Sequence, residues 1–92
     1  MITAIVLVHA APDKLPATAQ AIAEIDGVSE AYSCAGEIDI VAIVRVPDHQ
    51  DLATVIPERI NKVPGVLKTD THIAFRSYSR ADTESTFSLG EN

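Results

Sequence analysis

Ile25-Asp26-Gly27-Val28 returns, in altered form, as Val63-Pro64-Gly65-Val66, 38 positions further along the 92-residue chain. Ahead of each copy lies the same order of parts, namely an apolar strand-like run, a turn and a helix-like stretch. A second strand-like run follows each copy. A small chain that reads strand, helix, turn and strand twice has few ways to fold. The repeat therefore predicts two interlocked βαβ units and points to a binding and assembly module.

The composition describes one small acidic domain with an aliphatic core. Hydrophobic residues make up 47% of the chain and aromatic residues only 4%, so Ile, Val, Leu and Ala must fill the interior. A domain of this size hides only about 60–65% of its unfolded surface, so association between copies is an expected source of stability. The net charge of −6 argues against a direct nucleic-acid partner, because affinity for DNA and RNA rests mainly on Lys and Arg.

Signals of location are few. Cys34 is the single cysteine, so no disulfide can form within the chain, which suits a reducing cytoplasm. The apolar run 2–8 is too short to span a membrane and lacks the basic flank of a signal peptide. Strand-like sequence follows Met1 at once, so we expect no domain upstream, a cytoplasmic location and no membrane partner.

Four runs of the sequence have the character of strands. They are residues 2–9, 28–34, 38–46 and 66–78. The first and third are apolar on both alternating faces, which is typical of central strands covered on both sides. The second and fourth carry more polar residues, as expected at the edges of a sheet.

Two stretches between these strands carry apolar residues at helical spacing. The first begins near Pro16 and ends at Gly27, where a helix terminus often needs a left-handed residue. The second follows its N-cap, Asp48, and has Pro57 inside its apolar stripe. Because proline removes a backbone donor and clashes with the preceding turn, this helix should kink or split in two.

This order of elements predicts an α+β fold, a ferredoxin-like βαββαβ plait with an antiparallel sheet in the order 4-1-3-2. Both helices cover one face of the sheet. The other face carries Val41, Ile43 and either the even or the odd residues of the first strand. One chain cannot bury that face, so we expect a second copy to cover it, as in dimeric α/β-barrel proteins. The domain should span residues 1–78, followed by a polar tail at 79–92.

Four short motifs in this order resemble the effector-sensing (RAM) domain of the Lrp/AsnC regulators. They are Gly27-Val28, Gly36-Glu37-Ile38-Asp39, Pro64-Gly65-Val66 and Thr69-Asp70-Thr71. The resemblance covers roughly residues 1–76. It implies a domain that pairs sheet to sheet into dimers, which assemble further into rings with amino acids bound at the contacts between dimers. Family members usually carry a helix-turn-helix domain ahead of this one, so the resemblance implies a stand-alone module that modulates full-length regulators.

Residues 36–39 are the leading candidate for the ligand site. Gly36 marks a tight turn that exposes backbone N–H groups to a close ligand. Asp39 lies just inside the next strand, on the face away from the helices, and Glu37 is two residues away. The backbone N–H groups suit the carboxylate of an amino acid, and the side-chain carboxylates suit its ammonium. The competing interpretation is a plain hairpin turn with a solvated aspartate, and nothing in the sequence gives Asp39 a structural task.

Four further residues are candidates for the walls of the pocket. Thr69 and Thr71 share one strand face, and Tyr32 and Ser33 precede the glycine turn. β-Branched residues are also common at strand interfaces, so the threonines have that alternative. Tyr32 and Ser33 have the alternative of being ordinary edge surface.

The residues favour a non-enzymatic, oligomeric sensor of a small molecule, which the resemblance suggests is an amino acid. The alternative is a small dimeric α/β-barrel enzyme of the monooxygenase or isomerase type, and a third interpretation is a purely structural assembly module. Glu37 and Asp39 have no nucleophile nearby, and His9, His49 and His72 share no metal-ligand spacing. We therefore expect no metal and no cofactor. In the tail, Phe87 and Leu89 alternate as in a short strand, which suggests docking, with disorder as the alternative.

Overall fold

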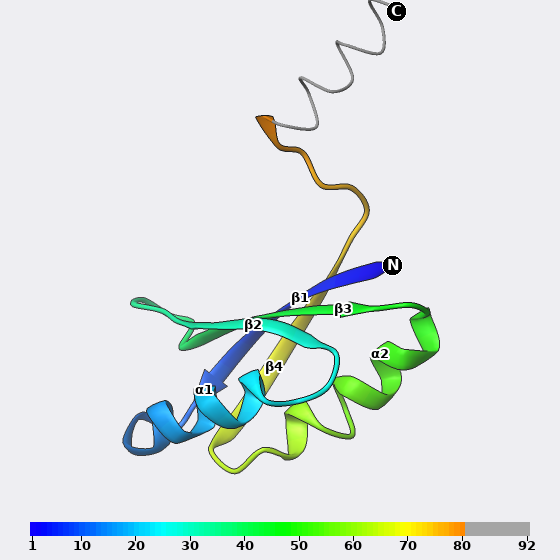
Figure 1. Cartoon of the computed structure of the whole chain (residues 1–92). Helices are drawn as coiled ribbons and strands as arrows, with labels where there is room; N and C mark the ends of the chain where they lie inside the picture. Colours follow the sequence, from blue (N-terminus) through cyan, green and yellow to red (C-terminus); the bar gives the residue numbers. More distant parts are fainter. Residues whose placement is uncertain (81–92) are drawn as a thin grey trace, which may run out of the picture.

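The computed structural model describes residues 1–80, which form one four-stranded antiparallel sheet with two helices on a single face (Figure 1). The elements in chain order are β1 (Ile2–Ala10), the 3₁₀ turn η1 (Pro12–Lys14), α1 (Leu15–Ala23), β2 (Val28–Ser33), β3 (Ile40–Val46), α2 (His49–Val55), the 3₁₀ turn η2 (Ile60–Lys62) and β4 (Val66–Ala74). The sheet order is β2-β3-β1-β4, so the predicted plait and its central and edge strands are confirmed.

The core lies between the sheet and the helices. The even residues of β1 from Ala4 onward and those of β3 are buried there, and Ile22 of α1 and Ile60 of η2 cover them from the other side. In the antiparallel register Val6 lies opposite Ala42 and Ile5 opposite Ile43. The odd residues of β1 therefore face the side without helices. This settles the choice between the two sets of the first strand, and we call this side the open face.

The two repeated tetrapeptides form the same turn twice. Val28 N–H donates to the Ile25 carbonyl at 3.0 Å, and Val66 N–H donates to the Val63 carbonyl at 3.1 Å. Each turn glycine also accepts a bond from the end of a central strand. Arg45 N–H donates to Gly27 O at 2.9 Å, and Ala11 N–H donates to Gly65 O at 2.8 Å. The sequence repeat is thus a structural repeat that ties each βαβ unit to the sheet.

Each turn packs against the helix of the other half. A Cβ on Gly27 would lie 2.8 Å from Val55 Cγ2 in α2, and a Cβ on Gly65 would overlap Thr18 Oγ1 in α1. Both glycines have φ near +100°, at 99° and 98°. Residues other than glycine rarely adopt that backbone conformation. At these two positions a side chain would also collide with the opposite helix. The crossed contacts lock the two units together.

The second helix splits at its proline, as one of the two expected outcomes. Asp51 accepts the Asp48 N–H at 3.1 Å and so caps the helix, which ends at Val55. The chain then turns past Pro57 and re-forms only as η2. The short helix and η2 still present Leu52, Val55 and Ile60 to the core. No helix among residues 1–80 is long and apolar enough to cross a bilayer.

The fourth strand is shorter than the sequence predicts. It ends at Ala74 rather than at residue 78, because its neighbour β1 begins at Ile2 and the last pair is Thr3 with Ala74. The third strand begins at Ile40 rather than at residue 38. The expectation for Phe87 and Leu89 lies outside the described residues.

Candidate functional site

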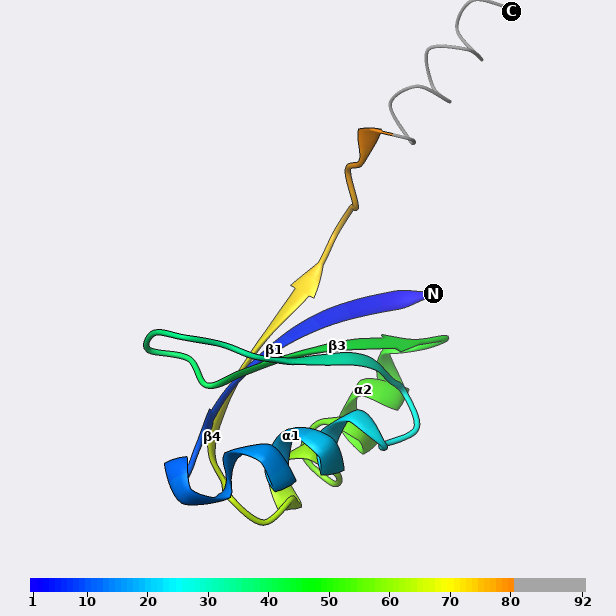
Figure 2. The ribbon, with the colours of Figure 1, turned by 60° about the vertical axis from the view of Figure 1, so that its left-hand side comes forward.

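The loop between β2 and β3 lies at one end of the sheet, the same end as the start of α1 (Figures 1 and 2). Two backbone bonds close its base. Cys34 N–H donates to Asp39 O at 2.8 Å, and Asp39 N–H donates to Val8 O at 3.0 Å. The loop is therefore a small structure anchored to both β2 and β1. It holds three of the predicted ligand residues, namely Gly36, Glu37 and Asp39.

Gly36 opens the loop to a ligand. Its φ is 119°, and nothing lies within 4 Å of the position where a Cβ would stand. Within residues 1–80, the backbone N–H groups of residues 35–38 donate to no protein acceptor. Gly36 and Glu37 are exposed. Successive free N–H groups in a glycine turn can donate hydrogen bonds to an anion such as a carboxylate.

Asp39 has a structural task that the sequence does not reveal. It stands just before β3 rather than inside it, and its Oδ2 accepts the Ala10 N–H at 2.8 Å. The carboxylate continues the β1–β3 ladder beyond the last strand pair, Val8 with Ile40. The expectation that Asp39 has no structural role is wrong. Its Oδ1 accepts no bond from the described residues and stays available to a cation.

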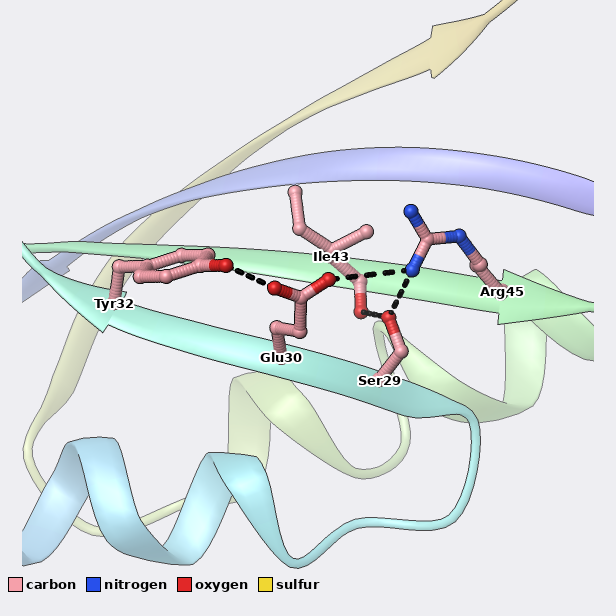
Figure 3. A network of polar contacts seen from close by, with 5 residues as sticks. All are labelled: Ser29, Glu30, Tyr32, Ile43 and Arg45. Carbon is pink, nitrogen blue, oxygen red and sulfur yellow. Dashed lines mark hydrogen bonds and ion pairs between the residues drawn. The ribbon is translucent and has the colours of Figure 1, made fainter. Parts of the chain in front are cut away.

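Tyr32 belongs to a polar network on the open face of β2 and β3 (Figure 3). Its hydroxyl donates to Glu30 Oε2, and Arg45 donates to Glu30 Oε1 at 3.4 Å and to Ser29 Oγ at 2.8 Å. The bond from Tyr32, followed by the contact with Arg45, lowers the pKa of Glu30. The same bond raises the pKa of Tyr32, because ionising the phenol would set two anions together. Sequence reasoning missed Glu30 and Arg45, which carry opposite charges on neighbouring strands.

The structure does not gather all the predicted residues in one place. Thr71 lies opposite Val6 and Thr69 opposite Val8, so both threonines lie on the helix side of the sheet. The Thr69 hydroxyl donates to Asn61 Oδ1 at 2.7 Å. Tyr32 lies opposite Val41, on the open face. Ser33 is exposed where β2 ends and the loop begins, so it is the wall candidate nearest to Gly36 along the chain.

The open face is apolar at its centre. Ile5 and Leu7 of β1 lie beside Ile43 and Val41 of β3, and no helix covers them. Ile5 is 36% exposed, although residues of its kind are usually inside. Charged side chains border this patch, including Arg45 on β3 and Asp70 on β4. The Oδ2 atom of Asp70 lies 3.1 Å from the Nε2 atom of His72.

Two surface cavities lie away from the loop. One, of about 260 Å³, lies between the start of β1 and the end of β4, where Thr3 and Phe75 line it. The other, of about 410 Å³, lies between α2 and the Gly27 turn. Neither is lined by a predicted ligand residue. In residues 1–80, no three His, Cys, Asp or Glu side chains gather as a metal ion would require.

Comparison with known proteins gives the family. The model of the Lrp/AsnC ligand binding domain matches residues 3–84. The chain therefore belongs to the Lrp/AsnC ligand-binding domain family, and the resemblance drawn from the four motifs is confirmed.

Individual relatives agree with this assignment. An uncharacterized HTH-type transcriptional regulator of Pyrococcus furiosus is 34% identical over 76 residues, which cover 79% of this chain and 51% of the relative. A solved protein of Thermus thermophilus is 42% identical with a TM-score of 0.81, over 87% of this chain and 100% of that one. A hypothetical protein of Pyrococcus horikoshii is 31% identical with a TM-score of 0.76, over 87% of this chain and 96% of that one. The chain spans about half the length of the curated Pyrococcus furiosus regulator it matches.

Proposed function

We propose that this chain is a stand-alone sensing and oligomerisation module of the Lrp/AsnC type that binds a small molecule, in the first place an amino acid. The observation that carries the proposal is the β2–β3 loop, where four free backbone N–H groups at residues 35–38 lie next to the Asp39 carboxylate. The N–H groups suit the carboxylate of an amino acid, and Asp39 Oδ1 suits its ammonium. No catalytic step is proposed, since the matched curated relatives are transcriptional regulators.

The proposed site is completed by further copies of the chain. The loop is exposed and lines neither surface cavity, so a lone chain offers a ligand only one wall. A sheet-to-sheet dimer through the open face would bury Ile5, Leu7, Val41 and Ile43, and would leave the loops at its rim. A second dimer could then close over the ligand, and repetition of this contact would build a ring. Full-length regulators of the family are the other proposed partners of this surface.

The stand-alone form is supported by solved chains of similar extent. The alignment covers 87% of this chain and 100% of the solved Thermus thermophilus chain, so a solved relative consists of this domain alone. We propose the same organisation here, with residues 1–78 as the sensing domain and 79–92 as a separate tail.

A thermal-shift screen against the twenty amino acids tests the proposal. A Neisseria meningitidis transcriptional regulator that shares the fold at 15% identity was solved as a complex with L-Met, so methionine belongs to the first set tested. We expect at least one amino acid to raise the melting temperature of the wild type, because a ligand that binds only the folded state stabilises it. Gly36→Val, which blocks close approach to the loop, should abolish the shift. No shift with any amino acid, at concentrations where the protein is oligomeric, would reject the amino-acid proposal.

A further inference from the structure

The two repeated turns differ in how they meet the opposite helix. At the second turn, Thr18 of α1 fills the contact, and its hydroxyl donates to Pro64 O at 2.9 Å. At the first turn, the helix residue against the glycine is Val55, which has no hydroxyl to offer. A cavity of about 410 Å³ remains there, between α2, the end of β3 and the chain from α1 to β2. Figure 2 shows this chain segment passing beside α2.

Charges of both signs line this cavity without pairing to one another. Asp26 lies on the turn, Asp51 on α2 and Arg59 just beyond it. No ion pair within 4.0 Å joins any of the three to a residue in the described part of the chain. Asp51 Oδ2 accepts the Asp48 N–H, and the second carboxylate oxygen of Asp51 accepts no bond from the described residues. Arg45 is the other cationic residue that lines the cavity, and its guanidinium already donates hydrogen bonds to Glu30 and Ser29.

The floor of the cavity is apolar. Val46 and Val55 line it and are buried members of the core, with exposed fractions of 3% and 5%. An aliphatic chain laid on these two residues would be removed from water, as the methylene stems of lysine side chains are on protein surfaces. The cavity is a groove broadly open to solvent, and its volume lies within the range of small-molecule sites, about 300–1,000 Å³.

We propose that this cavity binds a small molecule that carries two cationic groups and one carboxylate on an aliphatic chain, the class of lysine and ornithine. The two cationic groups meet the carboxylates of Asp26 and Asp51, and the carboxylate meets the guanidinium of Arg59. This site goes beyond the proposed function, because it is complete within one copy. It also lies at the opposite end of β3 from the loop, near Val46 rather than Asp39.

Nuclear magnetic resonance titration of the ¹⁵N-labelled full chain with L-lysine tests the inference. Three compounds of similar length separate the charges: norleucine lacks the side-chain ammonium, cadaverine lacks the carboxylate, and 6-aminohexanoate keeps one charge of each sign. We expect lysine to shift the amide signals of Gly27, Thr54 and Val55, and to bind about tenfold more tightly than each of the others, the effect of one charge-assisted hydrogen bond.

Matched variants locate the site. Arg59→Gln and Asp26→Asn should each weaken lysine binding about tenfold. Both substitutions change exposed residues, so we expect the fold to stay intact. Gln20→Ala, on the exposed side of α1 and outside both proposed sites, should leave the lysine titration unchanged. Shifts confined to residues 34–39 would overturn this inference while supporting the loop site. Equal affinity for lysine and norleucine, or no shift at about 10 mM lysine, would overturn it as well.

Discussion

The Thr18 hydroxyl of α1 donates a hydrogen bond to the carbonyl of Pro64, 46 residues away, at 2.9 Å. Thr18 is the one buried polar side chain among residues 1–80, with 1% of its surface exposed. Its Oγ1 also occupies the place where a Cβ on Gly65 would stand. One hydroxyl therefore joins the helix of the first half to the turn of the second.

Thr18→Val should destabilise the protein by about 1–3 kcal/mol, because the Pro64 carbonyl loses its partner in a partly buried place while the side-chain volume is kept. Urea unfolding followed by circular dichroism measures the free energy of unfolding. Gln20→Ala on the exposed side of α1 is the control and should change it little. Equal stability of Thr18→Val and wild type would show that the bond adds nothing to the fold.

Gly65→Ala should destabilise the protein more than Gly36→Ala, although both glycines have positive φ. At Gly36 the methyl group enters open space, so the cost is the left-handed conformation alone, about 1–2 kcal/mol. At Gly65 the collision with Thr18 Oγ1 adds a further cost of about 1–3 kcal/mol. The same unfolding experiment ranks the two. Adding Thr18→Ala to Gly65→Ala should recover part of the loss, and a Gly36→Ala variant as unstable as Gly65→Ala would contradict the packing argument.

The open face should make the chain a dimer or a larger assembly at low micromolar concentration. Ile43→Glu would bury an unpaired charge in that contact and should shift the protein towards the monomer. Light scattering coupled to size exclusion gives the mass of each species. Ala53→Glu on the exposed side of α2 supplies the matched control, and it should assemble as the wild type does. A wild-type protein that stays monomeric at high concentration would refute the dimer.

Tyr32→Phe should raise the pKa of Glu30 towards its ordinary value, because it removes the largest cause of the lowered pKa. The lowered pKa of Glu30 decides how its contribution to stability depends on pH. A carboxylate with a lowered pKa in the folded state stabilises the fold above its unfolded pKa, and the contribution is lost as pH falls through the folded value. A ¹³C titration of the side-chain carboxyl of Glu30 in both proteins measures the change. An unchanged titration would mean that the Tyr32 bond is not formed in solution.

Much of the fold could be predicted because two of its constraints are local. Strands apolar on both faces are expected at the centre and polar strands at the edges, and this agrees with the plait order predicted from the order of the elements, which the sheet has. The Gly27 turn follows shortly after α1, which ends at Ala23, whereas α2 ends at Val55 and η2 lies between it and the Gly65 turn. The faces of the threonines could not be predicted, since both alternating sets of β1 are apolar and only the observed register shows that Thr69 and Thr71 lie on the helix side.

The candidate site was accessible to sequence reasoning only in part. Gly36 in a hairpin predicts exposed N–H groups, because the requirement is local to the turn. The bond from Ala10 to Asp39 spans 29 residues and depends on where β3 starts, so no spacing rule finds it. The network of Glu30, Tyr32 and Arg45 depends in the same way on the pairing of β2 with β3.

Two substitutions separate the hydrogen bond that Asp39 makes to Ala10 from its proposed contact with a ligand. Asp39→Asn keeps an oxygen that can accept the Ala10 N–H but removes the negative charge. Asp39→Ala removes both, and should cost about 0.5–1.5 kcal/mol of stability for the lost hydrogen bond. If the loop binds an amino acid, both variants should bind it about ten- to a hundredfold more weakly, which is the loss of a charge-assisted bond to the ammonium.

Calorimetry with a ligand from the thermal-shift screen, together with urea unfolding, gives both quantities for each variant. The expected pattern is a stable Asp39→Asn protein with weak binding, and an Asp39→Ala protein that loses affinity and stability together. This pattern would attribute the loss of affinity to the charge and not to a disturbed β1 terminus. Wild-type affinity in Asp39→Asn would exclude the loop carboxylate as the ammonium partner. The search would then move to the Thr69 and Thr71 side of the sheet, where the Asn61 amide already bonds the Thr69 hydroxyl.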